Sequence, residues 1–159
     1  MMIFTLEQLQ AQIAEYPQNW RPLVLTNGCF DLLHMGHLRY LQQAKAFGRS
    51  LIVGINSDRS VQQLKPNRPI IPQAQRAELV MGLKPVDGVV IFDSITATGL
   101  IEILKPDIYA KGGDYTPDTL PEMPAVRDCG CRLELIQIEV ATSTSGIIEK
   151  ILAQSLPLL

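Results

Sequence analysis

The sequence has few of the features that mark membrane, secreted or nucleic-acid-binding proteins. No apolar stretch approaches the roughly 20 residues that span a bilayer, and no basic region followed by a long apolar run stands at the N-terminus. The formal net charge is −2 and no block rich in lysine or arginine occurs, which disfavours binding to nucleic acid or to an anionic membrane. The three cysteines form an odd set, which argues against a disulfide framework and indicates a reducing compartment. We therefore expect a cytoplasmic protein with no nucleic-acid partner and no membrane partner.

The sequence also lacks a Walker lysine loop and a G-x-G-x-x-G run, which disfavours an ordinary kinase or a dinucleotide dehydrogenase. Its 159 residues, 47% of them hydrophobic, suit one domain over 1–159 with one core. Short apolar runs at 23–25, 51–55, 86–92, 107–110 and 132–138 alternate with segments of helical periodicity, and residues 1–21 read as a helix and a linker. This order predicts a single-domain, Rossmann-like α/β fold, with a parallel sheet covered by helices on both faces and ligands at the carboxyl ends of the strands.

A polar, glycine-bearing turn joins strand to helix within residues 23–40 (LVLTNGCFDLLHMGHLRY). The only two histidines, His34 and His37, lie three apart around Gly36 and can face the same side of the first helical turn. The free backbone N–H groups and the helix dipole at this helix start favour binding of a phosphate. The two imidazoles are hydrogen-bond donors with no hydroxyl or thiol nucleophile obviously beside them, which suits stabilisation of charge in a transition state. Two other interpretations stay open: the pair caps the helix locally, or it binds zinc, which the lack of further ligands at suitable spacing disfavours.

Three other segments could meet a ligand. Residues 111–115 (KGGDY) follow a predicted strand and offer open backbone N–H groups and a lysine, although such a turn is often only a turn. Residues 65–69 (KPNRP) place two cations in a proline-stiffened loop, which is either a solvated crossover or a lid over a substrate phosphate. Residues 142–145 (TSTS) are ordinary N-cap types at the start of a helix. Prolines interrupt residues 116–130, where we expect a loop and at most two helical turns.

The run TNGCFD at 26–31, followed by HMGH at 34–37, resembles the signature of the cytidylyltransferase-like (HxGH) nucleotidyltransferases. The run at 143–148 resembles the second motif of that superfamily, and KGGDY closes the same strand in the adenylyltransferases that make ADP-heptose from heptose 1-phosphate for the lipopolysaccharide core. The resemblance covers about residues 22–152. Two departures stand out: Ile148 occupies a place where many relatives have a cation, leaving Lys150 as the nearest one, and residues 139–141 lack the arginine and proline of glycerol-3-phosphate cytidylyltransferases.

The resemblance implies attack by a sugar phosphate, such as heptose 1-phosphate, on the α-phosphorus of ATP, with release of pyrophosphate and with Mg²⁺ on the triphosphate. It also implies a homodimer and a separate sugar kinase that supplies the 1-phosphate. The alternatives are a CTP-dependent glycerol-3-phosphate cytidylyltransferase and a non-catalytic nucleotide-binding module. No protein metal ligands are expected. The implied catalytic residues are His34, His37 and Lys45. The implied nucleotide-binding residues are Asn27, Gly28, Cys29, Phe30, Asp31, Gly36, Lys111, Gly112, Asp114, Ser143, Thr144 and Ser145. The residues implied for the phosphate of the sugar are Lys65, Arg68 and Arg76.

Overall fold

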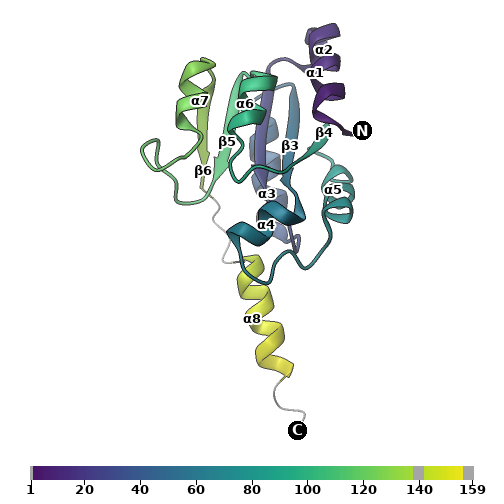
Figure 1. Ribbon diagram of the computed structural model, residues 1–159, viewed down its shortest axis with the longest axis vertical. Helices are drawn as coiled ribbons and strands as arrows, with labels where there is room; N and C mark the ends of the chain where they lie inside the picture. The colour runs from purple at the N-terminus through teal and green to yellow at the C-terminus, as the bar shows by residue number, and fades with distance from the viewer. Residues whose placement is uncertain (1, 138–141, 156–159) are drawn as a thin grey trace.

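A six-stranded parallel sheet forms the centre of the computed structural model, which describes residues 2–137 and 142–155 (Figure 1). All five strand pairs are parallel, and the strand order is β1-β4-β3-β2-β5-β6. The predicted α/β class is therefore confirmed. The strands are β1 Met2–Phe4, β2 Leu23–Gly28, β3 Ser50–Asn56, β4 Gly88–Phe92, β5 Ile108–Gly112 and β6 Arg132–Ile136.

The order of the strands reverses at β2, because β3 lies on one side of it and β5, much later in the sequence, on the other. Successive crossovers run in opposite directions from this point, so the loops after β2 and β5 separate and leave a crevice at their carboxyl ends. The HMGH turn follows β2 and the KGGDY turn includes the end of β5. The topology therefore brings two of the candidate segments to one edge of the sheet.

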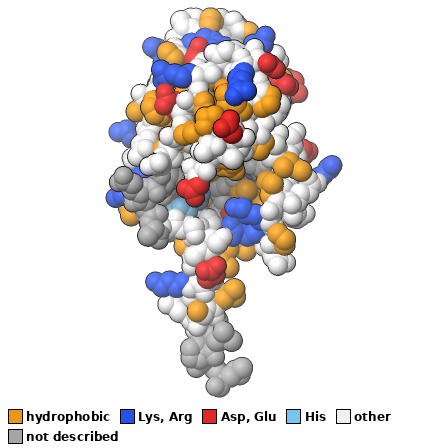
Figure 2. All heavy atoms as spheres, turned by 90° about the vertical axis from the view of Figure 1, so that its left-hand side faces the viewer, with side chains coloured by type: hydrophobic (Ala, Val, Ile, Leu, Met, Phe, Trp, Pro, Cys, Tyr) orange, Lys and Arg blue, Asp and Glu red, His pale blue; other side chains and the backbone are white. Residues whose placement is uncertain are grey.

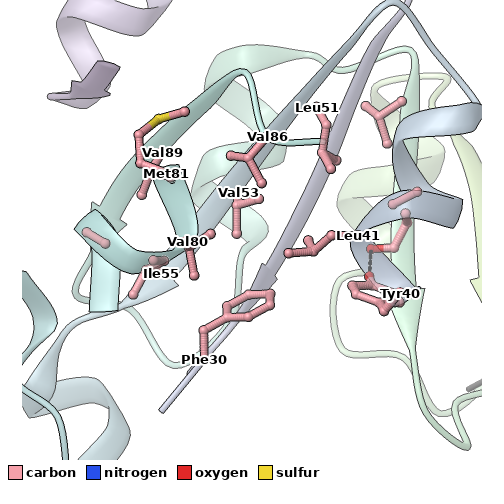
Figure 3. Close-up of a cluster of buried hydrophobic side chains, with 14 of the residues drawn as sticks. Phe30, Tyr40, Leu41, Leu51, Val53, Ile55, Val80, Met81, Val86 and Val89 are labelled. Atoms are coloured by element: carbon pink, nitrogen blue, oxygen red, sulfur yellow. Dashed lines mark hydrogen bonds between the residues drawn. The ribbon is translucent and has the colours of Figure 1, made fainter. Parts of the chain in front are cut away.

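Helices cover both faces of the sheet, as predicted. They are α1 Leu6–Glu15, α2 Pro17–Trp20, α3 Met35–Ala46, α4 Asp58–Leu64, α5 Gln73–Met81, α6 Thr98–Leu104, α7 Met123–Asp128 and α8 Thr144–Ser155. Side chains alternate along β2: Val24 joins the buried cluster formed with α3 and α5 (Figure 3), whereas Leu23 and Leu25 join the cluster formed with α1, α6 and α7. Both apolar faces of the strand are thereby buried.

Several local predictions can be compared with the structure. The helix predicted within residues 1–21 is present as α1, and it begins with a capping box in which Thr5 and Gln8 bond each other's backbone N–H groups. Residues 116–130, where we expected a loop and at most two helical turns, contain only the short α7. The edge strand β1 and the four-residue α2 were not predicted. Residues 138–141, which include the segment that argues against glycerol 3-phosphate, lie outside the described residues.

The last helix, α8, extends away from the body of the molecule (Figure 1). Its first residue is held at the cleft, because Thr144 Oγ1 donates a hydrogen bond to the carbonyl of Leu32, 3.2 Å away in the turn after β2. No helix among the described residues combines the length and the apolar character needed to cross a membrane.

Candidate functional site

A cleft with two adjoining lobes, each of about 430 Å³, lies at the carboxyl ends of β2 and β5. The floor is common to both lobes and includes Asn27–Phe30, His37, Lys65 and Gly112. The Glu122 lobe is lined in addition by residues such as Arg68, Lys111 and Glu122, and the His34 lobe by His34 and residues 142–145. Figure 2 shows this face hollowed between the body and α8, with a histidine on one side and cationic side chains on the other.

The two histidines face the same side at the start of α3, as their spacing predicted, with ring centroids 3.9 Å apart and ring planes inclined at 36°. They also cap the helix: His34 Nδ1 accepts from the N–H of Gly36 at 3.1 Å, and His37 Nδ1 accepts from the N–H of His34 at 3.3 Å. Because both Nδ1 atoms act as acceptors, the proton of each neutral ring sits on Nε2. The cap therefore fixes the tautomers and leaves each Nε2–H as a donor, so capping and phosphate binding are compatible roles.

Burial keeps these rings neutral. It lowers the pKa of His37 to about 4, with smaller contributions from His34 and Lys65, and it also lowers the pKa of His34. The ring of Phe30, whose backbone adopts the left-handed φ of 47°, lies 5.3 Å from that of His37 and contributes to this burial. Near neutral pH the pair therefore offers hydrogen-bond donors rather than fixed charges.

The start of α8 forms the opposite wall of the His34 lobe. Ser143 Oγ accepts from the N–H of Gly146 at 3.0 Å and so caps the helix. The hydroxyl-bearing residues 142–145 line the same lobe as the two histidines, although they are far apart in the sequence. A helix N-terminus has unpaired N–H groups and a positive dipole end, so this wall suits an anion.

Lys111 occupies the base of the Glu122 lobe. Its Nζ donates to Asn27 Oδ1 at 3.0 Å and to the hydroxyl of Tyr109 at 3.3 Å, and it pairs with Glu122 Oε1 at 3.5 Å. Burial lowers the pKa of Lys111, while the charge of Glu122 acts to raise it. The lysine is thus a partly shielded cation in the cleft.

Gly113, the residue after β5, has φ of +110°, so a glycine is needed to make the turn.

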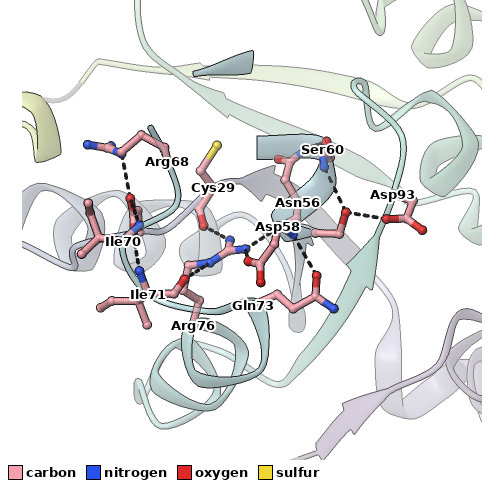
Figure 4. Close-up of polar contacts among 12 residues, drawn as sticks. Cys29, Asn56, Asp58, Ser60, Arg68, Ile70, Ile71, Gln73, Arg76 and Asp93 are labelled. Atoms are coloured by element: carbon pink, nitrogen blue, oxygen red, sulfur yellow. Dashed lines mark hydrogen bonds and ion pairs between the residues drawn. The ribbon is translucent and has the colours of Figure 1, made fainter. Parts of the chain in front are cut away.

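Arg76, to which the resemblance gives a role at the phosphate of the sugar, is not among the described residues that line either lobe. The side chain is fully buried, and its guanidinium donates to the carbonyls of Ile71 at 2.8 Å, Asn56 at 2.9 Å and Cys29 (Figure 4). It also pairs with Asp58 at 2.8 Å. Its guanidinium N–H groups bond backbone carbonyls from three segments, so the side chain holds these segments together beneath the cleft.

Asp31 and Arg68 form a second internal link. Asp31 is 1% exposed and accepts from the N–H groups of Ile70 and Ile71, while Arg68 pairs with it at 2.7 Å (Figure 4). This carboxylate therefore ties the loop 65–71 to the turn after β2, instead of presenting free oxygens to a nucleotide. Arg68 still lines the Glu122 lobe, and Lys65 lines both lobes.

Lys45, which the resemblance groups with the two histidines as catalytic, is not among the described residues that line either lobe. It lies in the last turn of α3, where its Nζ pairs with Asp87 at 2.5 Å and donates to the carbonyl of Arg49. It lies eight positions after His37 in the helix, which is on the order of 12 Å along the axis. The lysine therefore stabilises the far end of the sheet.

Three glycines and an aspartate complete the comparison with the sequence-based assignments. Gly28 and Gly112 line the cleft, as expected. Gly36 is buried and its N–H is used by the histidine cap, and Asp114 is exposed and is not among the described residues that line either lobe.

Tyr109 and Glu122 were missed by the sequence analysis. The position of Tyr109 was available in principle, because it lies two residues before Lys111 on a strand and so faces the same side of the sheet. Glu122 had no such signal, since it lies in the proline-interrupted segment before α7.

The sequence and structure resemble known proteins. Residues 25–150 match the cytidylyltransferase-like family. The bifunctional protein HldE of Syntrophotalea carbinolica is 49% identical over 133 residues, which cover 83% of this chain and 27% of that protein. The bifunctional protein HldE of Geotalea uraniireducens is 48% identical over 150 residues, covering 94% of this chain and 31% of that protein. The chain thus spans less than a third of these curated relatives.

Solved structures agree with the fold. The lipopolysaccharide core biosynthesis protein from Thermoplasma volcanium is 28% identical with a TM-score of 0.62, and the match covers 75% of this chain and 97% of that one. Pantothenate synthetase from Thermus thermophilus is 14% identical with a TM-score of 0.59, and the match covers 92% of this chain and 64% of that one. At that identity the second likeness concerns the fold alone.

Proposed function

The chain belongs to the cytidylyltransferase-like family, and we propose that it transfers AMP from ATP to a sugar phosphate such as heptose 1-phosphate, releasing pyrophosphate. One observation supports this proposal above the others. His34 and the hydroxyl-bearing start of α8 line one lobe, Arg68 lines the adjoining one, and His37 and Lys65 lie on the floor that both lobes share. A triphosphate and a sugar phosphate can thus be bound side by side.

The proposed reaction is an in-line attack by an oxygen of the sugar phosphate on the α-phosphorus of ATP. This nucleophile is already anionic, so the site needs no general base, and positioning together with charge stabilisation is sufficient. The Nε2–H groups of His34 and His37 would donate to oxygens of the transferring and leaving phosphates, where negative charge increases in the transition state. The N–H groups and hydroxyls at the start of α8 would hold the triphosphate in line.

We also propose Mg²⁺ as the counter-ion of the triphosphate. The described residues contain no group of three or more His, Cys, Asp or Glu side chains that could hold a metal ion, and the carboxylate of Asp31 is occupied by Arg68 and two backbone N–H groups. The phosphate oxygens would therefore supply most of the ligands, and the ion would neutralise their charge.

The choice of heptose 1-phosphate depends on the KGGDY turn and on the relatives, one of which is named for lipopolysaccharide core biosynthesis. With this substrate the proposal includes a sugar kinase that makes the 1-phosphate, a homodimeric state, and a reaction in the cytoplasm, where ATP is available.

A substrate panel tests the proposal. Pyrophosphate release would be measured with ATP or CTP, each combined with heptose 1-phosphate or glycerol 3-phosphate. We expect the highest kcat/KM for ATP with heptose 1-phosphate. A preference for CTP with glycerol 3-phosphate would make the substrate assignment wrong but keep nucleotidyl transfer, and no release with any pair would indicate a non-catalytic nucleotide-binding module.

A further inference from the structure

Glu122 is a buried carboxylate in the wall of the cleft, with one oxygen left without a partner. The residue is 2% exposed, and its Oε1 accepts from the N–H of Ala97 at 3.1 Å and pairs with Lys111 at 3.5 Å. Its Oε2 is buried and accepts no hydrogen bond within the described part of the chain. A buried carboxylate oxygen without a donor is costly, so a donor arriving with a ligand would gain by pairing with it.

The charges around the Glu122 lobe indicate what kind of donor this is. A phosphate next to Glu122 would be repelled, whereas Lys65 and Arg68 line the same lobe and attract an anion. A ligand that suits the whole lobe therefore has an anionic end and an uncharged end that bears hydrogen-bond donors. Hydroxyl groups on a sugar phosphate have this chemistry.

We propose that Glu122 selects the acceptor by receiving, at Oε2, a hydrogen bond from a hydroxyl group of the bound sugar phosphate. The inference builds on the proposed function, because it assigns the Glu122 lobe to the acceptor. A ribose hydroxyl of the nucleotide could donate in the same way. The acceptor is favoured because His34, Ser143 and Ser145, which suit the triphosphate, line only the other lobe.

Deoxy analogues of the acceptor test this role directly. The wild-type protein should discriminate against the analogue that lacks the bound hydroxyl by about 10- to 100-fold in kcat/KM, the range expected for a hydrogen bond to a charged group. Glu122→Gln keeps the size but loses the charge-assisted bond, and Glu122→Met removes every polar atom. Both variants should lose most of the discrimination. Glu102→Gln, which changes an exposed glutamate on α6, is the matched control and should retain it.

The pattern across substrates separates this role from others. If both Glu122 variants lowered kcat/KM equally for all acceptors and deoxy analogues, Glu122 would only position Lys111 and the proposal would be wrong. If discrimination changed instead against 2′- or 3′-deoxy-ATP, the hydroxyl would belong to the nucleotide and the acceptor assignment would be overturned.

Calorimetric titration of the sugar phosphates and their deoxy analogues makes the same comparison without turnover. Binding that depends on the hydroxyl and on Glu122, in a protein that releases no pyrophosphate, would reject the proposed reaction and support the role of Glu122. Normal turnover in the wild type, with unchanged discrimination in the Glu122 variants, would support the proposed reaction and reject the role of Glu122.

Discussion

Replacing Arg76 by methionine should destabilise the protein strongly, because this side chain holds three segments together. Three backbone carbonyls, those of Cys29, Asn56 and Ile71, would lose their donor, and Asp58 would lose its partner. An unsatisfied buried polar group costs roughly 1–3 kcal/mol, and removing one partner of a buried ion pair roughly 3–5. The half-exposed Asp58 can turn to solvent, which reduces its cost, and the costs of the three carbonyls do not add in full because one substitution removes all three bonds. We therefore expect a loss of about 3–5 kcal/mol in the free energy of unfolding, a large share of the roughly 5–15 kcal/mol that stabilises a typical protein.

Urea unfolding of the wild type and the variants measures this loss. Arg59→Met, which alters an exposed arginine on α4, is the matched control and should change stability by less than about 0.5 kcal/mol. Arg76→Lys keeps the charge but not the forked geometry, so it should fall between the two and stays measurable if Arg76→Met does not fold. A phosphate-binding arginine would behave differently: unchanged unfolding free energy with a raised KM for a phosphate substrate in Arg76→Lys would refute this reasoning.

Three further predictions concern the cleft. His37→Ala should lower kcat by roughly 10²–10³-fold, as the loss of a transition-state donor does, and wild-type turnover in a pyrophosphate assay would end the catalytic assignment. Because the pKa of His37 is lowered from 6.5 to about 4, the unfolded chain binds more protons between these values, so stability falls as pH decreases through this window. This loss of stability is at most ~3 kcal/mol, and about 2 kcal/mol after allowing for partial exposure. Between pH 7 and pH 5 the melting temperature should therefore fall less in His37→Gln than in the wild type, and an equal fall in both would contradict the assignment. Lys65→Ala should raise KM for the sugar phosphate without changing stability. Arg68→Ala should raise KM and also lower the melting temperature, because it leaves the buried Asp31 without its cation. Unchanged kinetics in both variants would reject a contact of these two residues with substrate.

The order of strands and helices could be predicted because apolar runs and helical periodicity are local signals. Strand β1 was not predicted, because three half-exposed residues are too few to show an alternating apolar pattern. Its place at the edge of the sheet depends on pairing with β4, which is distant in the sequence. The histidine pair could be placed because residues three apart in one helical turn must share a side. The same geometry predicts that Lys45 lies away from the turn, because most of the length of α3 separates the two.

Arg76 shows what a sequence cannot supply. An arginine in the first turn of a helix suits the surface, a phosphate site or an internal link equally well. Its role is decided by where the carbonyls of Cys29 and Asn56 point, and that depends on the assembled sheet. Glu122 could not be placed for a similar reason, because its burial depends on Lys111 and Ala97, which belong to other segments of the chain.

The most direct measurement of the proposed reaction follows labelled phosphate from ATP into the products. With [α-³²P]ATP and heptose 1-phosphate, the label should appear in the nucleotide sugar, and with [γ-³²P]ATP it should appear only in pyrophosphate. Label from the γ-position in the sugar product would indicate phosphoryl transfer, and release of labelled AMP without a sugar conjugate would indicate hydrolysis. Either result would contradict attack of the sugar phosphate on the α-phosphorus.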